Sequence, residues 1–307
     1  MKVLIVGLGS IALKHVYALR KIMPSVLIYA LRSGVNSNGV EGVISIYDVN
    51  QVPPDLDFII ISSPTFLHAL DISKCLAFNC PLFIEKPLFH QLGDEEEKVL
   101  SEILRNKTIT YVACNFRFHP IIKYVKGVLA NKNRRINEIN IYCGSYLPDW
   151  RPAKNFREIY SSWPEMGGGV HLDLIHELDY VYWLFGAPSR VISTKKNSSS
   201  LNINSIDFAS FILDYDTFSA CVTLNYYRTD KKRSFEIVFE DETWNCDLLT
   251  CRITSNNGNI IFEKDDYNIM NAYVDQLEYF RSQISTGRAP MNSIMEAREV
   301  LNIALHG

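Results

Sequence analysis

The stretch Val3-Leu4-Ile5-Val6-Gly7-Leu8-Gly9-Ser10-Ile11-Ala12 decides the fold of this chain. Its four apolar residues predict a short buried strand, and residues 13–22, which stop before Pro24, predict a helix. A strand that leads through G-x-G-x-x-A into a helix is typical of a dinucleotide-binding turn. The first glycine allows the tight turn, the second lets a pyrophosphate approach the backbone, and the alanine permits close packing of helix on strand. We therefore expect a dinucleotide to contact Gly7, Gly9, Ser10, Ile11 and Ala12; a flavin-binding or methyltransferase fold is the alternative.

The end of the second strand, expected over residues 26–30, selects the coenzyme. A NAD enzyme usually places a carboxylate there to bind the ribose 2′-hydroxyl. Here the residues are Leu31-Arg32-Ser33-Gly34, and the first carboxylate is Glu41. Arg32 can pair with a 2′-phosphate and Ser33 can donate to it, whereas in the alternative Arg32 only stacks on the adenine. We favour NADP over NAD.

The alternation of strands and helices continues to about residue 114. Strands are expected over 57–62, 81–84 and 108–114, and helices over 69–78 and 94–105. Ser63 and Pro64 follow one strand end and are expected to line the cofactor site, while His68 either lines that site or is a helix-start histidine. The acidic run 94–97 is interpreted as the start of a helix and not as a metal site.

Glu85-Lys86-Pro87 directly follows the apolar run 81–84. A lysine at the carboxyl end of a parallel strand points into the crevice where open α/β sheets bind ligands. The proline fixes the backbone at this corner. A cation on a rigid corner beside a cofactor suits an enzyme that holds a substrate hydroxyl or carbonyl; the alternative is a surface lysine in a turn.

From about residue 118 the pattern changes, so we expect two domains, 1–117 and 118–307. A helix over 121–130 and a strand over 136–145 precede an irregular aromatic stretch at 146–166. Further strands are expected over 190–194, 206–214, 219–227, 235–239 and 260–263, and closing helices, able to pack back on the first domain, over 271–286 and 293–305. The fold class is α/β: a Rossmann domain followed by an α+β domain with a large, mostly antiparallel open sheet.

Residues 167–179, with the sequence GGGVHLDLIHELD, carry the second candidate site. On the helix expected after the glycines, Asp173, His176 and Asp179 are spaced by three and share one face. A carboxylate one turn from a histidine can set its tautomer and stabilise the imidazolium, as acid–base catalysis requires. The alternative is a helix with solvated polar residues on one side, or a histidine satisfied by a cap; Glu177 and His171 fall on other faces.

Composition excludes several classes of protein. A net charge of −3 with dispersed signs gives no surface for nucleic acid, and no apolar stretch approaches the length of a membrane helix. A strand that begins right after Met1 leaves no room for a signal peptide. Seven scattered cysteines without C-x-x-C suit reduced thiols in the cytoplasm and give no disulfide framework or zinc site. We expect a cytoplasmic protein with no bound metal.

Taken together, these motifs resemble the Gfo/Idh/MocA oxidoreductase family over nearly the full length. The resemblance rests on the N-terminal glycine motif, Ser63-Pro64-x-x-x-His68, Glu85-Lys86-Pro87, the 167–179 segment and the closing helices. It implies a tightly held NAD(P), a sugar, nucleotide-sugar or cyclitol substrate, and a homodimer or homotetramer built through the C-terminal sheet. Lys86 and His176 become the catalytic lysine and acid–base histidine with Asp173 beside them, Glu85 joins the cofactor contacts, and the expected substrate contacts are Lys86, Arg117, Trp150, Asp173 and His176.

One departure from the family pattern concerns the spacing of the acid and the histidine. The family usually places the acid four residues before the histidine, but Asp173 precedes His176 by three, so Asp179 is the alternative partner. This segment and Pro148-Asp149-Trp150-Arg151-Pro152 resemble a subgroup of bacterial surface-glycan pathways.

The leading hypothesis is hydride transfer between nicotinamide and a sugar carbon. The alternatives are transient use of NAD in an elimination or hydrolysis, and a non-catalytic dinucleotide-binding protein. Residues 227–231 spell the Y-x-x-x-K of short-chain dehydrogenases, but they follow an antiparallel strand, which is the wrong context.

Overall fold

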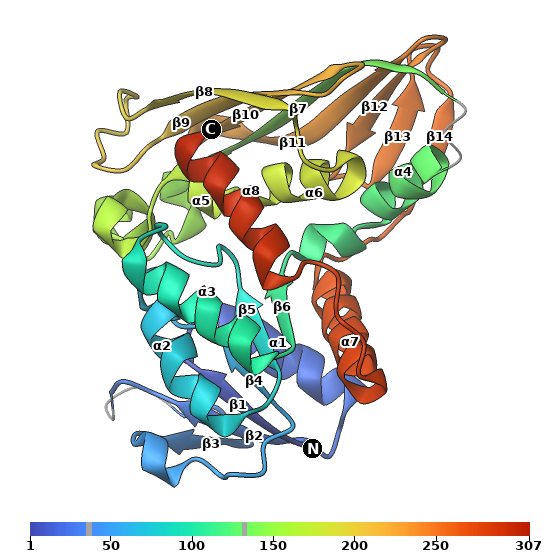
Figure 1. The fold of residues 1–307 in the computed structure, drawn as a ribbon. Coiled ribbons are helices and arrows are strands. Elements are labelled where there is room, and N and C mark those ends of the chain that lie inside the picture. Colours follow the sequence, from blue (N-terminus) through green and yellow to red (C-terminus); the bar gives the residue numbers. More distant parts are fainter. Residues whose placement is uncertain (35–38, 131–133) are drawn as a thin grey trace. The chain divides into compact units, whose positions relative to one another are not determined.

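The computed structural model describes residues 1–34, 39–130 and 134–307, which divide into two compact units (Figure 1). The first unit contains residues 1–115 and 269–299, and the second contains residues 116–268 and 300–307. The last helical segments of the chain are therefore shared between the two units.

The first unit is built on a six-stranded, entirely parallel sheet. Its strand order is β3-β2-β1-β4-β5-β6, so the order reverses between β1 and β4. This is the Rossmann arrangement that the N-terminal motif predicts, and ligands bind at such a reversal. The strands are β1 Lys2–Val6, β2 Leu27–Leu31, β3 Val43–Ile46, β4 Phe58–Ile61, β5 Leu82–Glu85 and β6 Thr110–Ala113.

Helices flank this parallel sheet in two pairs: α1 contacts α7, and α2 contacts α3 (Figure 1). Phe280 of α7 is fully buried, with ring centroids 5.3 Å from Phe58 and 5.5 Å from Phe83 of the sheet. A helix near the end of the chain thus completes the core of the N-terminal unit. The helices are α1 Ser10–Ile22, α2 His68–Cys75, α3 Asp94–Asn106 and α7 Met270–Thr286, with short 3₁₀ turns at Val49–Gln51, Thr65–Leu67 and Leu76–Phe78.

The second unit contains an eight-stranded sheet in the order β14-β13-β12-β11-β7-β10-β9-β8. Only the β7–β10 pair is parallel among its described strand pairs, so the predicted, mostly antiparallel sheet is confirmed. The strands are β7 Ile136–Tyr146, β8 Arg190–Lys196, β9 Phe208–Asp214, β10 Ser219–Asn225, β11 Tyr227–Phe239, β12 Thr243–Asp247, β13 Arg252–Ser255 and β14 Ile260–Glu263.

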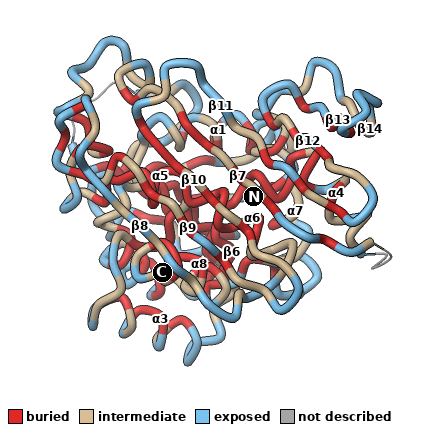
Figure 2. The backbone as a smooth tube through the Cα atoms, turned by 90° about the horizontal axis from the view of Figure 1, so that it is seen from above, coloured by how far each residue is buried: buried red, intermediate tan, exposed pale blue. Residues whose placement is uncertain are grey.

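One face of this sheet forms the core of the second unit. In β9 the residues Ala209, Phe211 and Leu213 are buried, while Ile212 is exposed. In β10 buried residues alternate with half-buried ones. Figure 2 shows buried and less buried positions along these strands. The helices of this unit are α4 Pro120–Ala130, α5 Val170–Asp173, α6 His176–Phe185 and the end of α8 Ile294–His306. Short 3₁₀ turns lie at Asn115–Phe118, Leu147–Trp150, Phe156–Glu158, Tyr160–Ser162 and Pro164–Met166.

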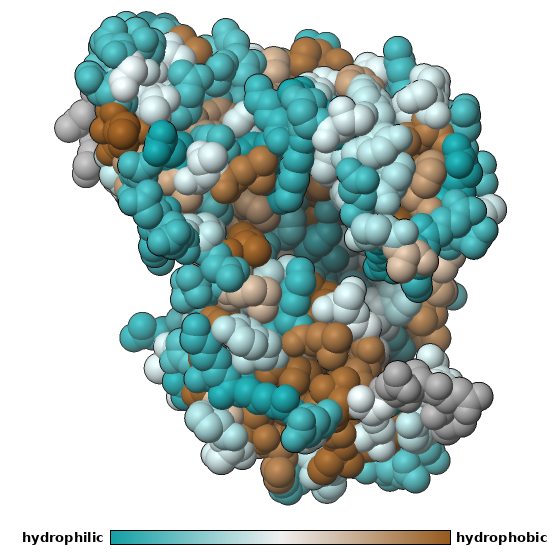
Figure 3. Space-filling model, turned by 180° about the vertical axis from the view of Figure 1, so that it is seen from behind, coloured by the Kyte–Doolittle hydropathy of each residue, from teal (hydrophilic) through white to brown (hydrophobic). Residues whose placement is uncertain are grey.

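Within the described residues, no helix is both long and apolar enough to cross a bilayer, and no group of three or more histidine, cysteine or acidic side chains could hold a metal ion. On the face shown in Figure 3, most side chains are hydrophilic, and hydrophobic side chains gather in the lower part of the view.

Candidate functional site

The turn between β1 and α1 requires glycine at its first position. Gly7 has φ +83° and its N–H donates to the Leu31 carbonyl at 2.9 Å. A Cβ at Gly7 would lie 2.8 Å from the Cα of Ser63, which follows β4. Both the backbone conformation and this close approach therefore exclude a side chain.

The second glycine of the motif leaves room in front of helix α1. Gly9 is the N-cap of α1, and none of the described side chains caps the helix. A Cβ placed on Gly9 would meet no described atom within 4 Å. Ser10 is exposed, Ile11 is half-buried, and Ala12 is fully buried beneath the turn. An anion is stabilised at such a helix start, so these residues fit the pyrophosphate of a dinucleotide.

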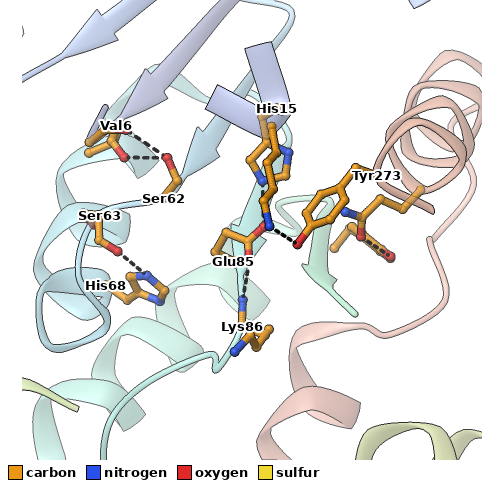
Figure 4. Close-up of polar contacts among 12 residues, drawn as sticks. Val6, His15, Ser62, Ser63, His68, Glu85, Lys86 and Tyr273 are labelled. Carbon is orange, nitrogen blue, oxygen red and sulfur yellow. Dashed lines mark hydrogen bonds and ion pairs between the residues drawn. The ribbon is translucent and has the colours of Figure 1, made fainter. Parts of the chain in front are cut away.

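Two serines after β4 border the same turn. The Ser62 hydroxyl lies 3.0 Å from the Gly7 carbonyl and 3.2 Å from the Val6 carbonyl, and its contact with Val6 is seen in Figure 4. These contacts connect the end of β4 to the turn. The Ser63 hydroxyl is buried and has no hydrogen-bond partner in the described part of the chain. Pro64 is exposed and precedes the 3₁₀ turn that leads into α2. A buried hydroxyl beside a glycine turn is suited to bond a cofactor oxygen.

His68 is a buried link between two loops of the first unit. It is the first residue of α2, and its ring nitrogens lie 3.0 Å from the Ser63 carbonyl and 3.1 Å from the Leu88 carbonyl. Burial lowers the pKa of His68, although both carbonyls oppose this effect. The side chain therefore connects the loop after β4 with the loop after β5.

Arg32 lies directly after β2, as the sequence predicts for the residue that selects the coenzyme. Its guanidinium donates to the Ser45 hydroxyl at 3.0 Å and lies 6.0 Å from the Tyr47 ring. The side chain is mostly buried, whereas Ser33 is exposed. This end of the sheet thus carries a positive charge at the position where NAD enzymes carry a carboxylate.

The Glu85-Lys86-Pro87 corner begins at Glu85, the last residue of β5, and the Lys86–Pro87 bond is cis. Lys86 is half-buried. Glu85 is buried and its carboxylate accepts hydrogen bonds from the His15 ring at 2.6 Å and from the Lys86 amide at 3.2 Å (Figure 4). Lys14 directly precedes His15 on α1. Burial lowers the pKa of Lys14, and the nearby charge of Glu85 opposes this effect. The corner predicted from the sequence is therefore held by side chains of α1.

In the second unit, the glycine run serves the fold of the chain. Gly167 and Gly169 have φ +82° and +132°. A Cβ at Gly168 would collide with the backbone of Tyr160 and Ser161. The close approach at this glycine is therefore made by protein backbone.

The prediction of a single helix after these glycines is wrong. Helix α5 ends at Asp173 and α6 begins at His176, with Leu174 at φ −101° and ψ +30° between them. The spacing of three therefore does not place Asp173 and His176 on one face of a continuous helix. Asp173, His176 and Asp179 are all buried, so the alternative of a solvated polar face is also wrong.

Asp173 is held by two tyrosines. Its carboxylate accepts hydrogen bonds from the Tyr160 hydroxyl at 2.9 Å and the Tyr226 hydroxyl at 2.5 Å. The Asp173 charge raises the pKa of Tyr160, and burial followed by that charge raises the pKa of Tyr226. Trp150 is half-buried and lies edge-on to Tyr226, with ring centroids 5.3 Å apart. The predicted residues Trp150 and Asp173 thus belong to one cluster, which we call the tyrosine–aspartate cluster.

His176 begins helix α6 and is 9% exposed. Its ring centroid lies 5.1 Å from that of Phe116. The next residue, Glu177, pairs with Arg233 through two hydrogen bonds of 2.6 and 3.0 Å, and the Arg233 guanidinium lies 3.9 Å from the Phe116 ring. The surroundings of His176 thus combine an aromatic ring with a matched pair of charges.

Arg117, which we expected to contact substrate, forms a buried ion pair. Its Nε and Nη2 donate to the two carboxylate oxygens of Asp179 at 2.9 and 2.6 Å, and the two side chains are 0% and 1% exposed. The charge of Asp179 is therefore matched by Arg117.

Sequence reasoning missed the residues that hold the predicted ones: His15, Tyr160 and Tyr226. His15 lies on the buried side of α1, and a histidine in an amphipathic helix is an ordinary core residue. The two tyrosines lie 66 residues apart in the chain and meet only through the fold. No local pattern could have found them.

The turn, the strand order and the Glu-Lys-Pro corner define a NAD-binding Rossmann domain. The model of the oxidoreductase family with a NAD-binding Rossmann fold matches residues 1–112, and the model of the GFO/IDH/MocA C-terminal domain matches residues 132–244. The two matches together cover most of the chain. The chain belongs to the Gfo/Idh/MocA family of oxidoreductases.

Among curated relatives, the chain is 26% identical over 234 residues to the uncharacterized oxidoreductase YrbE of Bacillus subtilis, covering 72% of this chain and 65% of that protein. It is 28% identical over 150 residues to 2,7-anhydro-N-acetylneuraminate hydratase of Mediterraneibacter gnavus, covering 47% of this chain and 37% of that protein. The matches thus span less than two thirds of these relatives.

Among solved structures, UDP-N-acetylglucosamine 3-dehydrogenase GnnA from Acidithiobacillus ferrooxidans superposes with a TM-score of 0.79 at 17% identity. The superposition covers 99% of this chain and 95% of that chain. The two chains therefore share the fold.

Proposed function

We propose that the protein is an NAD(P)-dependent dehydrogenase or reductase that acts on a carbinol or carbonyl carbon of a sugar, nucleotide sugar or cyclitol. The observation that carries the proposal is Lys86: a lysine on a corner fixed by Glu85, directly after the inner strand β5 of a NAD-binding Rossmann domain. Ligands of such sheets bind outside the carboxyl ends of the strands.

In the proposed reaction the protein positions the substrate and moves one proton. The nicotinamide, when bound, supplies or accepts the hydride. Lys86 holds the substrate oxygen through its ammonium group, and His176 takes the proton in oxidation or returns it in reduction. Asp173 provides a negative charge that favours the protonated imidazole, and Tyr160 and Tyr226 hold that charge in place.

The coenzyme in this proposal is NADP in preference to NAD. Arg32 provides the charge that a 2′-phosphate needs, and the end of β2 has no carboxylate to bind a free 2′-hydroxyl. The contact with Ser45 holds the guanidinium beside this strand end. Ser33 is exposed and available as a second donor.

A sugar or nucleotide-sugar substrate is supported by the activities of similar proteins. GnnA is a UDP-N-acetylglucosamine dehydrogenase of the same fold, and the hydratase relative acts on a sialic-acid derivative. We further propose a role in bacterial surface-glycan metabolism in the cytoplasm, for which the fold shared with a UDP-N-acetylglucosamine dehydrogenase is the supporting observation. We further propose that the protein is a homodimer or homotetramer formed through the C-terminal sheet, whose outer face exposes Ile192 and Ile212.

A second candidate function is a reaction that uses NAD transiently without net oxidation. It is favoured by the hydratase relative, because hydration changes no overall oxidation state. The two functions differ in a simple measurement. Net hydride transfer changes the absorbance of reduced coenzyme at 340 nm in proportion to product, with a rise in substrate oxidation and a fall in substrate reduction, whereas transient use gives product without a lasting change in absorbance.

The proposal is tested with a panel of nucleotide sugars, free sugars and cyclitols, assayed with both coenzymes. With any substrate that turns over, Lys86→Ala should lower kcat by about 10²–10⁴ with little change in coenzyme affinity. Lys74→Ala, at an exposed lysine of α2, is the matched control and should leave kcat unaltered. His176→Asn should remove a titration from the pH profile of kcat/KM. Unchanged kcat in Lys86→Ala would eliminate the proposed mechanism.

A further inference from the structure

His15 and Lys86 are linked through the carboxylate of Glu85, which contacts the His15 ring with one oxygen and the Lys86 amide with the other. We propose that His15 is a positioning residue, which fixes the backbone of Lys86 by holding Glu85. The inference rests on the proposed role of Lys86 in catalysis. It assigns to Glu85 a structural task in place of the cofactor contact expected from the sequence.

The geometry of Glu85 carries this inference. One carboxylate oxygen lies 2.6 Å from Nε2 of His15, and the other accepts the Lys86 amide hydrogen at 3.2 Å (Figure 4). The side chains of His15 and Glu85 are 0% and 8% exposed. Both oxygens of Glu85 are therefore engaged inside the protein, and hydrogen bonds to a charged carboxylate are stronger than neutral ones.

The tautomer of His15 follows from its second nitrogen. Nδ1 is buried and has no hydrogen-bond partner within the described residues. Leaving a buried N–H without an acceptor is costly, so the hydrogen of a neutral ring belongs on Nε2, where it is donated to Glu85. His15 thus presents one donor to one carboxylate oxygen, which is sufficient to hold that side chain and gives the ring no further polar task.

The ring of His15 is itself fixed by aromatic neighbours. It lies edge-on to Phe83 of β5 at a centroid distance of 5.0 Å and to Tyr273 of α7 at 6.0 Å. Phe83 is two residues before Glu85 on the same strand. The histidine, the strand and the lysine corner therefore form one rigid assembly, as a precisely placed catalytic group requires.

Hydrogen exchange of the Lys86 amide tests the inference without any substrate. Protein labelled with ¹⁵N-lysine gives one amide signal per lysine, and Lys86→Arg identifies the signal of Lys86. In His15→Leu the Glu85 carboxylate loses its donor, and exchange of the Lys86 amide should accelerate about tenfold or more, the effect of losing a hydrogen bond to a charged acceptor. His15→Gln is the matched variant that can still donate, and its exchange should stay within about threefold of the wild type.

The controls separate this inference from the proposed function. The amides of Lys74 and Lys98, on α2 and α3 of the same unit, should keep their exchange rates if the fold is intact. Unchanged exchange of Lys86 in a folded His15→Leu protein would overturn the inference, whatever Lys86→Ala does to kcat. If His15→Leu does not fold, the variant His15→Leu/Glu85→Leu replaces both partners by apolar groups. Its Lys86 amide should also exchange fast, and slow exchange there would overturn the inference.

Discussion

Replacing Arg117 by Met distinguishes a structural from a substrate-binding arginine. The two hydrogen bonds to Asp179, at 2.9 and 2.6 Å, join side chains that are at most 1% exposed. Arg117→Met keeps an apolar chain of similar length but leaves the Asp179 carboxylate buried without its counter-charge. Removing one partner of a buried ion pair costs about 3–5 kcal/mol, so we expect the free energy of unfolding to fall by that amount.

The tryptophans of this chain allow the unfolding of the second unit to be measured separately from that of the first. All four tryptophans, at positions 150, 163, 183 and 244, belong to it. Intrinsic fluorescence during urea unfolding therefore reports on the unit that contains the ion pair. With an m-value of about 2 kcal/mol/M, the expected loss lowers the midpoint by about 1.5–2.5 M urea. The Arg117 guanidinium lies 5.6 Å from the Trp183 ring, so the amplitude of the signal will also change, but the midpoint does not depend on amplitude.

A double variant is the control for this experiment. Arg117→Met/Asp179→Leu removes both charges, and because apolar residues often replace a buried ion pair without loss, most of the lost stability should return. A substrate-binding Arg117 would give the opposite pattern: a raised KM in the single variant with an unaltered urea midpoint. A loss of less than about 1 kcal/mol in Arg117→Met would refute the reasoning from burial.

Two further predictions concern the coenzyme and acid stability. Arg32→Ala should weaken NADP binding by about 1.5–3 kcal/mol and leave NAD nearly unaltered in a fluorescence titration, and equal losses would mean that Arg32 only stacks on adenine. Burial lowers the pKa of His119 to about 4, so the fold keeps this ring neutral while the unfolded chain takes up a proton below about pH 6.5. Its contribution to stability is therefore present above pH 6.5 and is lost as the pH falls to about 4, by up to about 1.4 kcal/mol per pH unit. His119→Gln should make the urea midpoint depend less steeply on pH between about pH 6.5 and pH 4. The same pH dependence in the variant and the wild type would contradict the prediction.

The Rossmann half was predictable because its constraints are local. The conformation of Gly7, the space in front of Gly9 and the position of Lys86 after a strand each follow from a few neighbouring residues. The same is true of strands with clear apolar runs. Strands β3, β12 and β13 were missed because they are short and interrupted by polar residues, and their pairing with neighbours decides their conformation.

The geometry of residues 167–179 was predicted less well, because it depends on distant residues. The break between α5 and α6 occurs at Leu174 and Ile175, where no glycine or proline marks it. The sequence pattern of residues 167–179 suggested a polar face, but these polar residues are buried, and their partners lie elsewhere in the chain: Tyr160 and Tyr226 for Asp173, Arg233 for Glu177 and Arg117 for Asp179.

The concentration of buried ionisable residues between positions 171 and 179 is itself an argument for function. His171, Asp173, His176, Glu177 and Asp179 are each at most 9% exposed. Burying a charge is costly, and well-packed apolar residues often stabilise a core at least as well as a buried ion pair, so stability alone does not account for this density. Glu177 pairs with Arg233, and Asp179 pairs with Arg117. The hydrogen bonds described for the Asp173 carboxylate come instead from the neutral hydroxyls of Tyr160 and Tyr226, and this difference is the reason to test Asp173 first for the proposed support of His176.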